Sequence, residues 1–410
     1  MLNAALPSMI KFLLLPLFAM ATCLATEVQN LPLLRLKMQG SPRDAAAECS
    51  AQLFVPAAEG ASDAAPRPGT VKVRGALSRQ FEKKSLTLKL KQDASWLGLR
   101  EEKEWVLNAA FIDFSMMRHK LSYDLFRSLG DARSPRFAAG SRFIEVELNG
   151  HYHGVFLLME AIKGSMLGLS AGDDKNPAVM YKAVTFFANF TKPGHAEFEQ
   201  KKPDPDQKAF WGPLDDLNGF VSESSDQAFF DQRTGIGARI DVANAVDFHL
   251  FVLLTSNIDG ISKNYLLVRD SPTPRQPAPK FFFVPWDYDA TWGRNWDGSK
   301  VDEKNWLSNR LFDRLMSNSF YRPLVARRWQ DLRARQFSEA NILRMIEANV
   351  RTLGPAAARN ELRWRNIDGK NPAVFSFAKD LAEMREWVPL RLRWLDGEIK
   401  NRTSPQASTK

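Results

Sequence analysis

The sequence has 410 residues, of which 44% are hydrophobic and 25% are charged, and its formal net charge is +9. This composition is ordinary for a folded globular protein and excludes a disordered or fibrous chain. The length is sufficient for two lobes or two domains with sizeable cores. The densest basic stretch, residues 322–335, has the spacing of a solvated helix face, and no nucleic-acid-binding motif is present, so we expect no nucleic-acid partner.

The first 25 residues have the pattern of a secretory signal. Lys11 precedes an apolar run over residues 12–21, and small residues follow as far as Ala25. We predict cleavage after Ala25 and export to the periplasm or the cell exterior. A buried amino-terminal helix and a lipid anchor at Cys23 are the alternatives. No later run of about 18 apolar residues exists, so the mature chain is predicted not to span a membrane.

The next part of the chain is predicted to form short strands with turns between them. The apolar residues Leu86, Leu88 and Leu90 alternate, so one face of their strand should be buried. Lys84 shares this parity, and an inward-facing lysine needs an anion because an unpaired buried ammonium is costly. The predicted strands are residues 31–38, 70–74, 85–91 and 105–108.

A helix over Ser115–Leu129 is predicted to end at Gly130. Two further strands, residues 143–148 and 155–159, are separated by Asn149 and Gly150, a pair that strongly favours a hairpin turn. The polar span 197–237 is predicted to be an irregular insertion with one or two short helices.

From residue 242 onward the pattern is mainly helical. An apolar helix is predicted over 242–254, followed by short strands at 265–268 and 280–284. Four amphipathic helices follow at residues 305–317, 320–333, 338–352 and 377–400. A β-rich part followed by an α-rich part predicts an α+β fold.

The acidic residues beside these short strands are the candidate chemical site. Asp259 and Asn264 precede the first strand, and Asp287 and Asp289 follow the second. Such oxygen ligands suit a hard cation such as magnesium or manganese. Protein kinases place an Asp, four residues and an Asn before a hairpin and a metal-holding Asp. Each residue taken alone is also typical of a turn, and spacing does not distinguish Asp287 from Asp289 as the main ligand.

Several separated motifs resemble the CotH family of spore-coat-type kinases over residues 70–400. They begin with Arg74-Gly75 and the Lys83-Lys84 strand entry, followed by Asp113 with Arg118 and the Asn149-Gly150 hairpin. The later motifs are Tyr181-Lys182, Asn257-Ile258-Asp259 with Asn264, and Pro285-Trp286-Asp287-Tyr288-Asp289.

The resemblance implies a bilobal, atypical protein-kinase-like fold. Residues 26–162 would form a β-rich N-lobe, 163–400 a mainly helical C-lobe and 401–410 a disordered tail. It also implies transfer of phosphate from ATP to Ser or Thr of a protein substrate with Mg or Mn. Asp259 would orient the substrate hydroxyl, while Asn264 with Asp287 or Asp289 would hold the metal.

The remaining candidates concern the nucleotide. Lys84 is the candidate phosphate contact and Lys182 a second one, while Glu160 ends the strand that would lead into the hinge. Arg118 would either pair with Asp113 or reach the phosphates. His119, His151 and His153 are expected to be surface or packing residues.

Two departures from the family pattern weaken the case for phosphate binding. Gly75 is the only glycine of its loop, and Leu77 stands where the family has a small polar residue. The alternatives are a non-catalytic, kinase-like scaffold at the envelope or surface, and a transferase that uses another phosphate-bearing donor.

Overall fold

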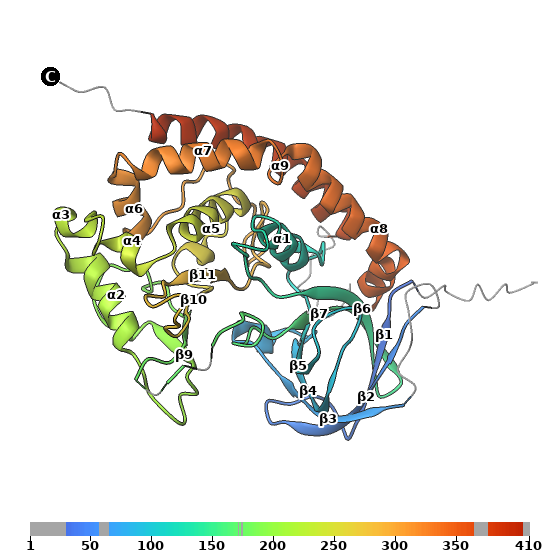
Figure 1. The fold of residues 1–410 in the computed structure, drawn as a ribbon. Helices are drawn as coiled ribbons and strands as arrows, with labels where there is room; N and C mark the ends of the chain where they lie inside the picture. Colours follow the sequence, from blue (N-terminus) through green and yellow to red (C-terminus); the bar gives the residue numbers. More distant parts are fainter. Residues whose placement is uncertain (1–29, 57–64, 171, 174, 365–375, 405–410) are drawn as a thin grey trace, which may run out of the picture.

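The computed structural model describes residues 30–56, 65–170, 172–173, 175–364 and 376–404, which form an α+β fold (Figure 1). The strands are β1 (Leu33–Met38), β2 (Ala47–Phe54), β3 (Arg67–Val73), β4 (Leu86–Ala94), β5 (Glu102–Asn108), β6 (Ser141–Leu148), β7 (His151–Glu160), β8 (Val179–Ala183), β9 (Phe198–Lys202), β10 (Tyr265–Arg269) and β11 (Phe282–Pro285). The helices are α1 (Arg118–Arg127), α2 (Gly212–Glu223), α3 (Asp226–Phe229), α4 (Ile236–Arg239), α5 (Val242–Thr255), α6 (Arg310–Ser317), α7 (Tyr321–Arg333), α8 (Glu339–Trp364) and α9 (Phe377–Thr403), with short 3₁₀ turns at Leu77–Gln80 and Asp259–Ile261.

The first seven strands form a closed barrel in the order β1-β2-β3-β4-β5-β7-β6. The parallel pairing of β1 with β6 closes it, with Leu33 opposite Glu145. The predicted hairpin between β6 and β7 is confirmed, because Asn149 and Gly150 both have positive φ, at 51° and 82°. The sequence indicated these strands singly but gave no sign of β2 or of barrel closure.

The barrel interior is filled by alternating side chains. Leu86, Leu88 and Leu90 of β4 all point inward, as their spacing predicted, and join a buried cluster with Trp105 and Phe156. The barrel therefore has its own core and is a packed body rather than a pore.

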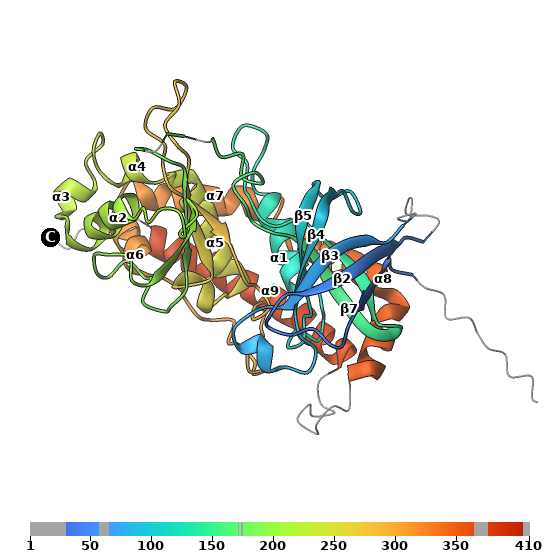
Figure 2. The same ribbon diagram turned by 90° about the horizontal axis from the view of Figure 1, so that it is seen from below.

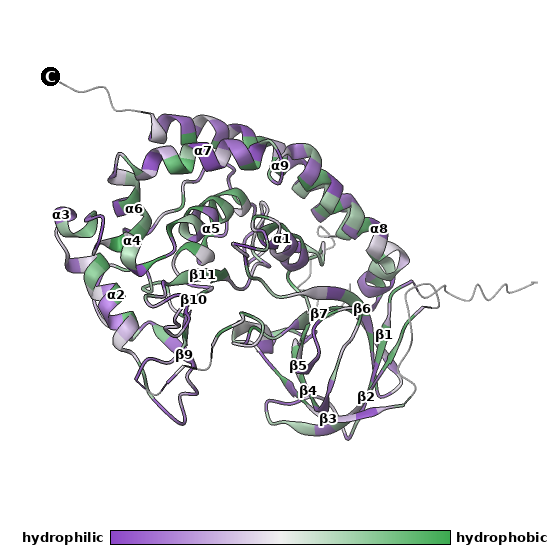
Figure 3. Cartoon of the chain, viewed as in Figure 1, coloured by the Kyte–Doolittle hydropathy of each residue, from purple (hydrophilic) through white to green (hydrophobic). Residues whose placement is uncertain are grey.

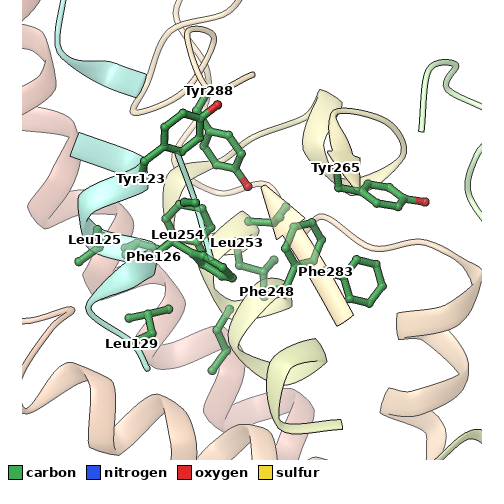
Figure 4. Packing of buried hydrophobic residues seen from close by; sticks show 14 of the residues in the cluster. Tyr123, Leu125, Phe126, Leu129, Phe248, Leu253, Leu254, Tyr265, Phe283 and Tyr288 are labelled. Carbon is green, nitrogen blue, oxygen red and sulfur yellow. The ribbon is translucent and has the colours of Figure 1, made fainter. Parts of the chain in front are cut away.

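A second sheet has the order β11-β10-β8-β9, and α5 packs against it. Nearly every residue of α5 is buried, and its first turn is capped by Asp241, whose side chain accepts from the Asn244 amide at 3.0 Å. Figure 4 shows Phe248 of α5 stacked on Phe283 of β11, while Phe126 of α1 lies against the other side of α5. This core fixes α1 relative to the loop that follows β11.

Helices α7, α8 and α9 run along one side of the molecule in Figure 1, and α8 reaches the barrel (Figure 2). Their alternating hydrophilic and hydrophobic bands in Figure 3 are those of helices with one buried face. In α8 the Asn360 side chain accepts from the Val155 amide at 3.0 Å, and Trp364 Nε1 donates to the His153 carbonyl at 3.0 Å. Helix α8 thus attaches the barrel to the helical part.

Two predictions about the chain's organisation were wrong. The span 197–237 is not an irregular insertion, because it contains β9, which completes the second sheet, although the short helices expected there are present as α2, α3 and α4. Helix α9 extends to Thr403, so the tail does not begin at residue 401. The predicted signal at 1–25 and residues 405–410 lie outside the described residues. Within the described part of the chain, no helix is both long and apolar enough to cross a membrane.

Candidate active site

The loop after β11 carries Asp287 in an unusual backbone conformation. Its φ is 58°, in the left-handed region that non-glycine residues seldom adopt. The Asp287 amide donates to the Tyr123 hydroxyl at 3.0 Å, and its carbonyl accepts from Asn257 Nδ2 at 3.4 Å. A backbone in this region persists only when neighbours hold it, and such residues cluster at functional sites.

Helix α1 holds the Asp287 side chain as well as its backbone. His119 lies one helical turn before Tyr123, and its Nε2 is 3.3 Å from Asp287 Oδ1. The two rings of α1 also contact each other edge to face. The histidine is buried, whereas the Asp287 side chain is 45% exposed, so its second oxygen can face a ligand.

The pKa values of the two carboxylates in this loop are shifted in opposite directions. Crowding by the protein raises the pKa of Asp287, but the His119 contact and the positive charges of Lys182 and Arg74 outweigh it and hold that pKa below its usual value. Burial, reinforced by the charge of Asp287, raises the pKa of Asp289 to about 7. Two neighbouring carboxylates whose negative charge is not fully balanced by nearby positive groups favour the binding of a cation.

Two basic side chains from different sheets converge beside Asp287. Arg74 follows β3 of the barrel, and its guanidinium carbon lies 5.5 Å from the centroid of the Trp286 ring. Lys182 lies on β8 of the second sheet, and its Nζ is 5.2 Å from the same centroid. Burial lowers the pKa of both groups, and the charge of Asp287 counteracts this effect. The arrangement is suited to an anion next to the acidic loop.

Asp259 begins the 3₁₀ turn after α5, and its carboxylate is 3.1 Å from Lys263 Nζ. Asn257 links this turn to the acidic loop, because its Oδ1 accepts from the Gly260 amide at 2.8 Å while its Nδ2 reaches the Asp287 carbonyl. The Asn264 carbonyl in turn accepts from the Trp286 amide at 3.0 Å. The structure therefore joins the segments of Asp259, Asn264 and Asp287 through hydrogen bonds.

The inference that Lys84 lies on the inward face of β4 was wrong. Its Nζ donates to the carbonyls of Arg79 and Phe81, at 2.7 and 3.0 Å, within its own turn. Strand β4 begins only at Leu86, so the strand alternation does not extend back to residue 84. The buried lysine is Lys83, whose ammonium bonds the Ala109 carbonyl at 2.8 Å and Asn360 Oδ1 at 3.0 Å and also contacts the Val155 carbonyl.

Of the two alternatives for Arg118, pairing is correct and a phosphate contact is contradicted. Its guanidinium is 1% exposed and bonds Asp113 at 2.6 Å, Asp380 at 2.5 and 2.9 Å, and the Thr291 carbonyl at 2.8 Å. Each of its three nitrogens donates to a partner inside the fold.

Glu160 is similarly engaged inside the fold. It is 6% exposed, and its two oxygens accept from the backbone amides of Arg100 and Gly140, both at 2.9 Å. A nucleotide contact from this carboxylate is therefore not supported.

Sequence reasoning gave no role to His119, Tyr123 or Asn257, all of which contact Asp287. His119 was expected to be a surface or packing residue, yet it contacts Asp287. Its four-residue spacing from Tyr123 placed both on one helix face, which was the available signal. His153 is a packing residue, as expected, since its ring lies against Phe156 and Trp364.

The donor set can be tested against a divalent metal. Among the described residues, no group of three or more His, Cys, Asp or Glu side chains stands at metal-binding distances. Magnesium in phosphate-transferring sites is commonly held by one or two carboxylates together with substrate phosphates and water. The carboxylates of Asp287 and Asp289 are oxygen ligands of this kind, while a place for the Asn264 side-chain amide beside them stays a prediction.

Comparisons with known proteins place the chain in a family. The family model for the CotH kinase protein matches residues 71–395. The chain belongs to the CotH family. Inner spore coat protein H of Bacillus subtilis (strain 168) is 30% identical over 290 residues, which cover 67% of this chain and 74% of the relative. The matched family region includes Arg74, Lys182, Asp259 and the Asp287–Asp289 loop.

Proposed function

We propose that this CotH-family chain is an exported, metal-dependent kinase that transfers the γ-phosphoryl group of ATP to Ser or Thr hydroxyls of proteins. The observation that carries the proposal is the convergence of Arg74 and Lys182, from two different sheets, on the acidic loop of Asp287. We further propose that the barrel and the second sheet with its helices act as the two lobes of a kinase-like fold. The relative is named for the inner spore coat, and export of this chain to the periplasm or the cell exterior is part of the proposal.

The residues would divide the work of phosphoryl transfer as follows. Arg74 and Lys182 would bind phosphate oxygens, which replaces the role first expected of Lys84. Asp287, Asp289 and Asn264 would hold Mg or Mn, which neutralises charge on the phosphates when bound. His119 and Tyr123 would keep Asp287 oriented toward the ligand.

Asp259 would accept the proton of the substrate hydroxyl. The hydroxyl oxygen forms a bond to the γ-phosphorus as the bond from phosphorus to the ADP oxygen breaks, and the hydroxyl proton passes to the Asp259 carboxylate. Lys263, at 3.1 Å, orients this carboxylate. Positioning and charge neutralisation supply most of the rate in this chemistry.

Metal binding is tested by Asp287→Asn, which keeps the side-chain size and suits the left-handed backbone but removes the charge. We expect MnCl₂ with ATP to stabilise the wild type by about 3 kcal/mol at about 100 times Kd, and Asp287→Asn to lose most of this gain. Denaturation in urea with and without the ligands measures it, with the exposed Asp206→Ala as control.

The outcomes separate the alternatives. If MnCl₂ with ATP stabilises Asp287→Asn as much as the wild type, the Asp287 carboxylate does not bind the metal and has only a structural role. A wild type that responds to neither metal nor ATP would favour the scaffold. A response to metal but not to ATP would favour a different phosphate-bearing donor.

Phosphate binding is tested by Lys182→Met, which keeps the length of the side chain and removes its charge. We expect the Kd for ATP, measured by calorimetry with manganese, to rise about tenfold. Lys84→Met is the matched control, because the Lys84 ammonium is held by backbone carbonyls of its own turn. Equal weakening by both variants would contradict the assignment of Lys182.

A further inference from the structure

Two segments next to the Asp259 turn carry exposed apolar side chains. On the loop after β8, Val184, Phe186 and Phe187 are 40%, 52% and 65% exposed, and Ile258, directly before Asp259, is 38% exposed. We call these four residues the Phe186 ridge. Single exposed apolar residues are common, but a group of this kind marks an interaction site.

The ridge is joined to Asp259 by one side chain. Lys263 Nζ lies 4.0 Å from the centroid of the Phe186 ring and 3.1 Å from Asp259 Oδ2. The ammonium therefore stands between the aromatic face and the carboxylate, and its attraction to the ring fixes the ring beside the turn. A group held at Asp259 has the ridge as its immediate neighbour.

Hydrogen bonds hold the loop that presents the two phenylalanines. The Val184 amide donates to the Glu197 carbonyl at 3.0 Å, and the Phe187 amide donates to Thr185 Oγ1 at 3.2 Å. Ala188 follows in the core, where its carbonyl accepts from the Tyr265 hydroxyl at 2.5 Å. A turn held by hydrogen bonds therefore keeps the two rings exposed. Apolar surface in water is unfavourable in free energy, and a partner that covers the rings would remove this penalty.

We propose that the Phe186 ridge binds the acceptor segment of the protein substrate and selects a Ser or Thr flanked by large aliphatic or aromatic residues. This proposal rests on the proposed kinase function, because it places the acceptor hydroxyl at Asp259. An extended segment advances about 3.3 Å per residue, so residues one to three positions from the acceptor can reach Phe186, which Lys263 links to Asp259.

The charges around the ridge agree with an apolar occupant. Two lysines approach its rings, Lys263 over Phe186 and Lys192 at 5.9 Å from the Phe187 ring. Each is paired with a carboxylate, Lys263 with Asp259 and Lys192 with Glu197 at 2.9 Å. Because these charges are balanced locally, the surface discriminates by apolar contact more than by the charge of the flanking residues.

The test uses two fluorescent peptides of equal length with one Ser, flanked by Leu and Phe in one and by Gly in the other. The double variant Phe186→Ser/Phe187→Ser is expected to raise KM for the apolar peptide at least about tenfold with kcat little changed, as loss of uniform binding predicts. KM for the Gly peptide should not change. Phe320→Ser is the control, since Phe320 is 78% exposed at the start of α7.

Peptide binding is also measured by fluorescence anisotropy without ATP, so the readout does not depend on catalysis. Transfer with equal KM for both peptides in the wild type would overturn the ridge proposal and leave the kinase function standing. Ridge-dependent binding without any transfer would overturn the kinase function and leave a peptide-binding surface. Ridge-dependent dimerisation or binding to lipid vesicles, without a preference between peptides, would overturn the ridge proposal.

Discussion

Asp259→Asn is expected to lower the rate of phosphoryl transfer by about two to four orders of magnitude, as loss of a general base does. The amide keeps the size of the side chain and can still accept from Lys263, but it cannot take the hydroxyl proton. The Asp259–Lys263 pair is partly exposed, and such pairs contribute only about 0–1 kcal/mol to stability. The variant should therefore stay folded and bind metal and ATP as the wild type does.

The measurement is the initial rate of radiolabel transfer from ATP to a Ser-containing peptide in the presence of manganese. Stability in urea and the Kd for ATP are measured on the same preparation, so a folding defect is detected separately. Asp206→Asn, an exposed carboxylate elsewhere on the surface, provides the matched control. Equal rates in Asp259→Asn and wild type would rule out the role assigned to this carboxylate.

Local patterns predicted much of the fold because they depend on neighbouring residues. The Asn149-Gly150 turn, the buried face of β4 and the apolar helix α5 all follow from short-range spacing and are confirmed. The parallel closure of β1 on β6 joins residues more than a hundred positions apart and has no local signal. Strand β9 was hidden because its sequence, FEQKK, is polar and lies at the edge of the second sheet.

The candidate site likewise has residues with a local sequence signal and contacts that depend on tertiary packing. Asp287 and Asp289 stood out because two acidic residues follow a short apolar strand, and Lys182 came from a family motif. The contact between His119 and Asp287, and that between Arg74 and Trp286, depend on how α1 and the barrel pack against the second sheet. Lys84 was misplaced because the alternation of β4 was extended beyond the first residue of the strand.

Buried ion pairs hold α1 against the acidic loop, and Asp380 of α9 lies at their centre. Its carboxylate is fully buried and accepts from Arg118 at 2.5 and 2.9 Å, from Arg294 Nε at 2.9 Å and from the Ser115 amide at 2.8 Å. Arg118 in turn donates to the Thr291 carbonyl, two residues after Asp289. The network thus connects α9, the helix that carries His119, and the loop of Asp287.

Asp380→Ala is expected to lower the free energy of unfolding by about 3–5 kcal/mol, because two buried guanidiniums each lose one of their two carboxylate partners. Arg118 would keep Asp113, and Arg294 would keep Glu383. Urea denaturation measures this loss. Glu398→Ala is the matched control on the same helix: its carboxylate pairs with the exposed Arg402 one turn further along, so at most about 1 kcal/mol should be lost.

A double variant identifies the cause of this destabilisation. If buried charge without a full set of partners dominates, the loss of free energy of unfolding in Arg118→Met combined with Asp380→Ala should be clearly less than the sum of the two single losses. The reason is that the double variant removes both members of the pair, whereas each single variant leaves one buried charge without this partner. Strict additivity would contradict the account. Where Asp380→Ala remains folded, it should also weaken binding of manganese, since α1 would no longer hold His119 and Tyr123 firmly against Asp287.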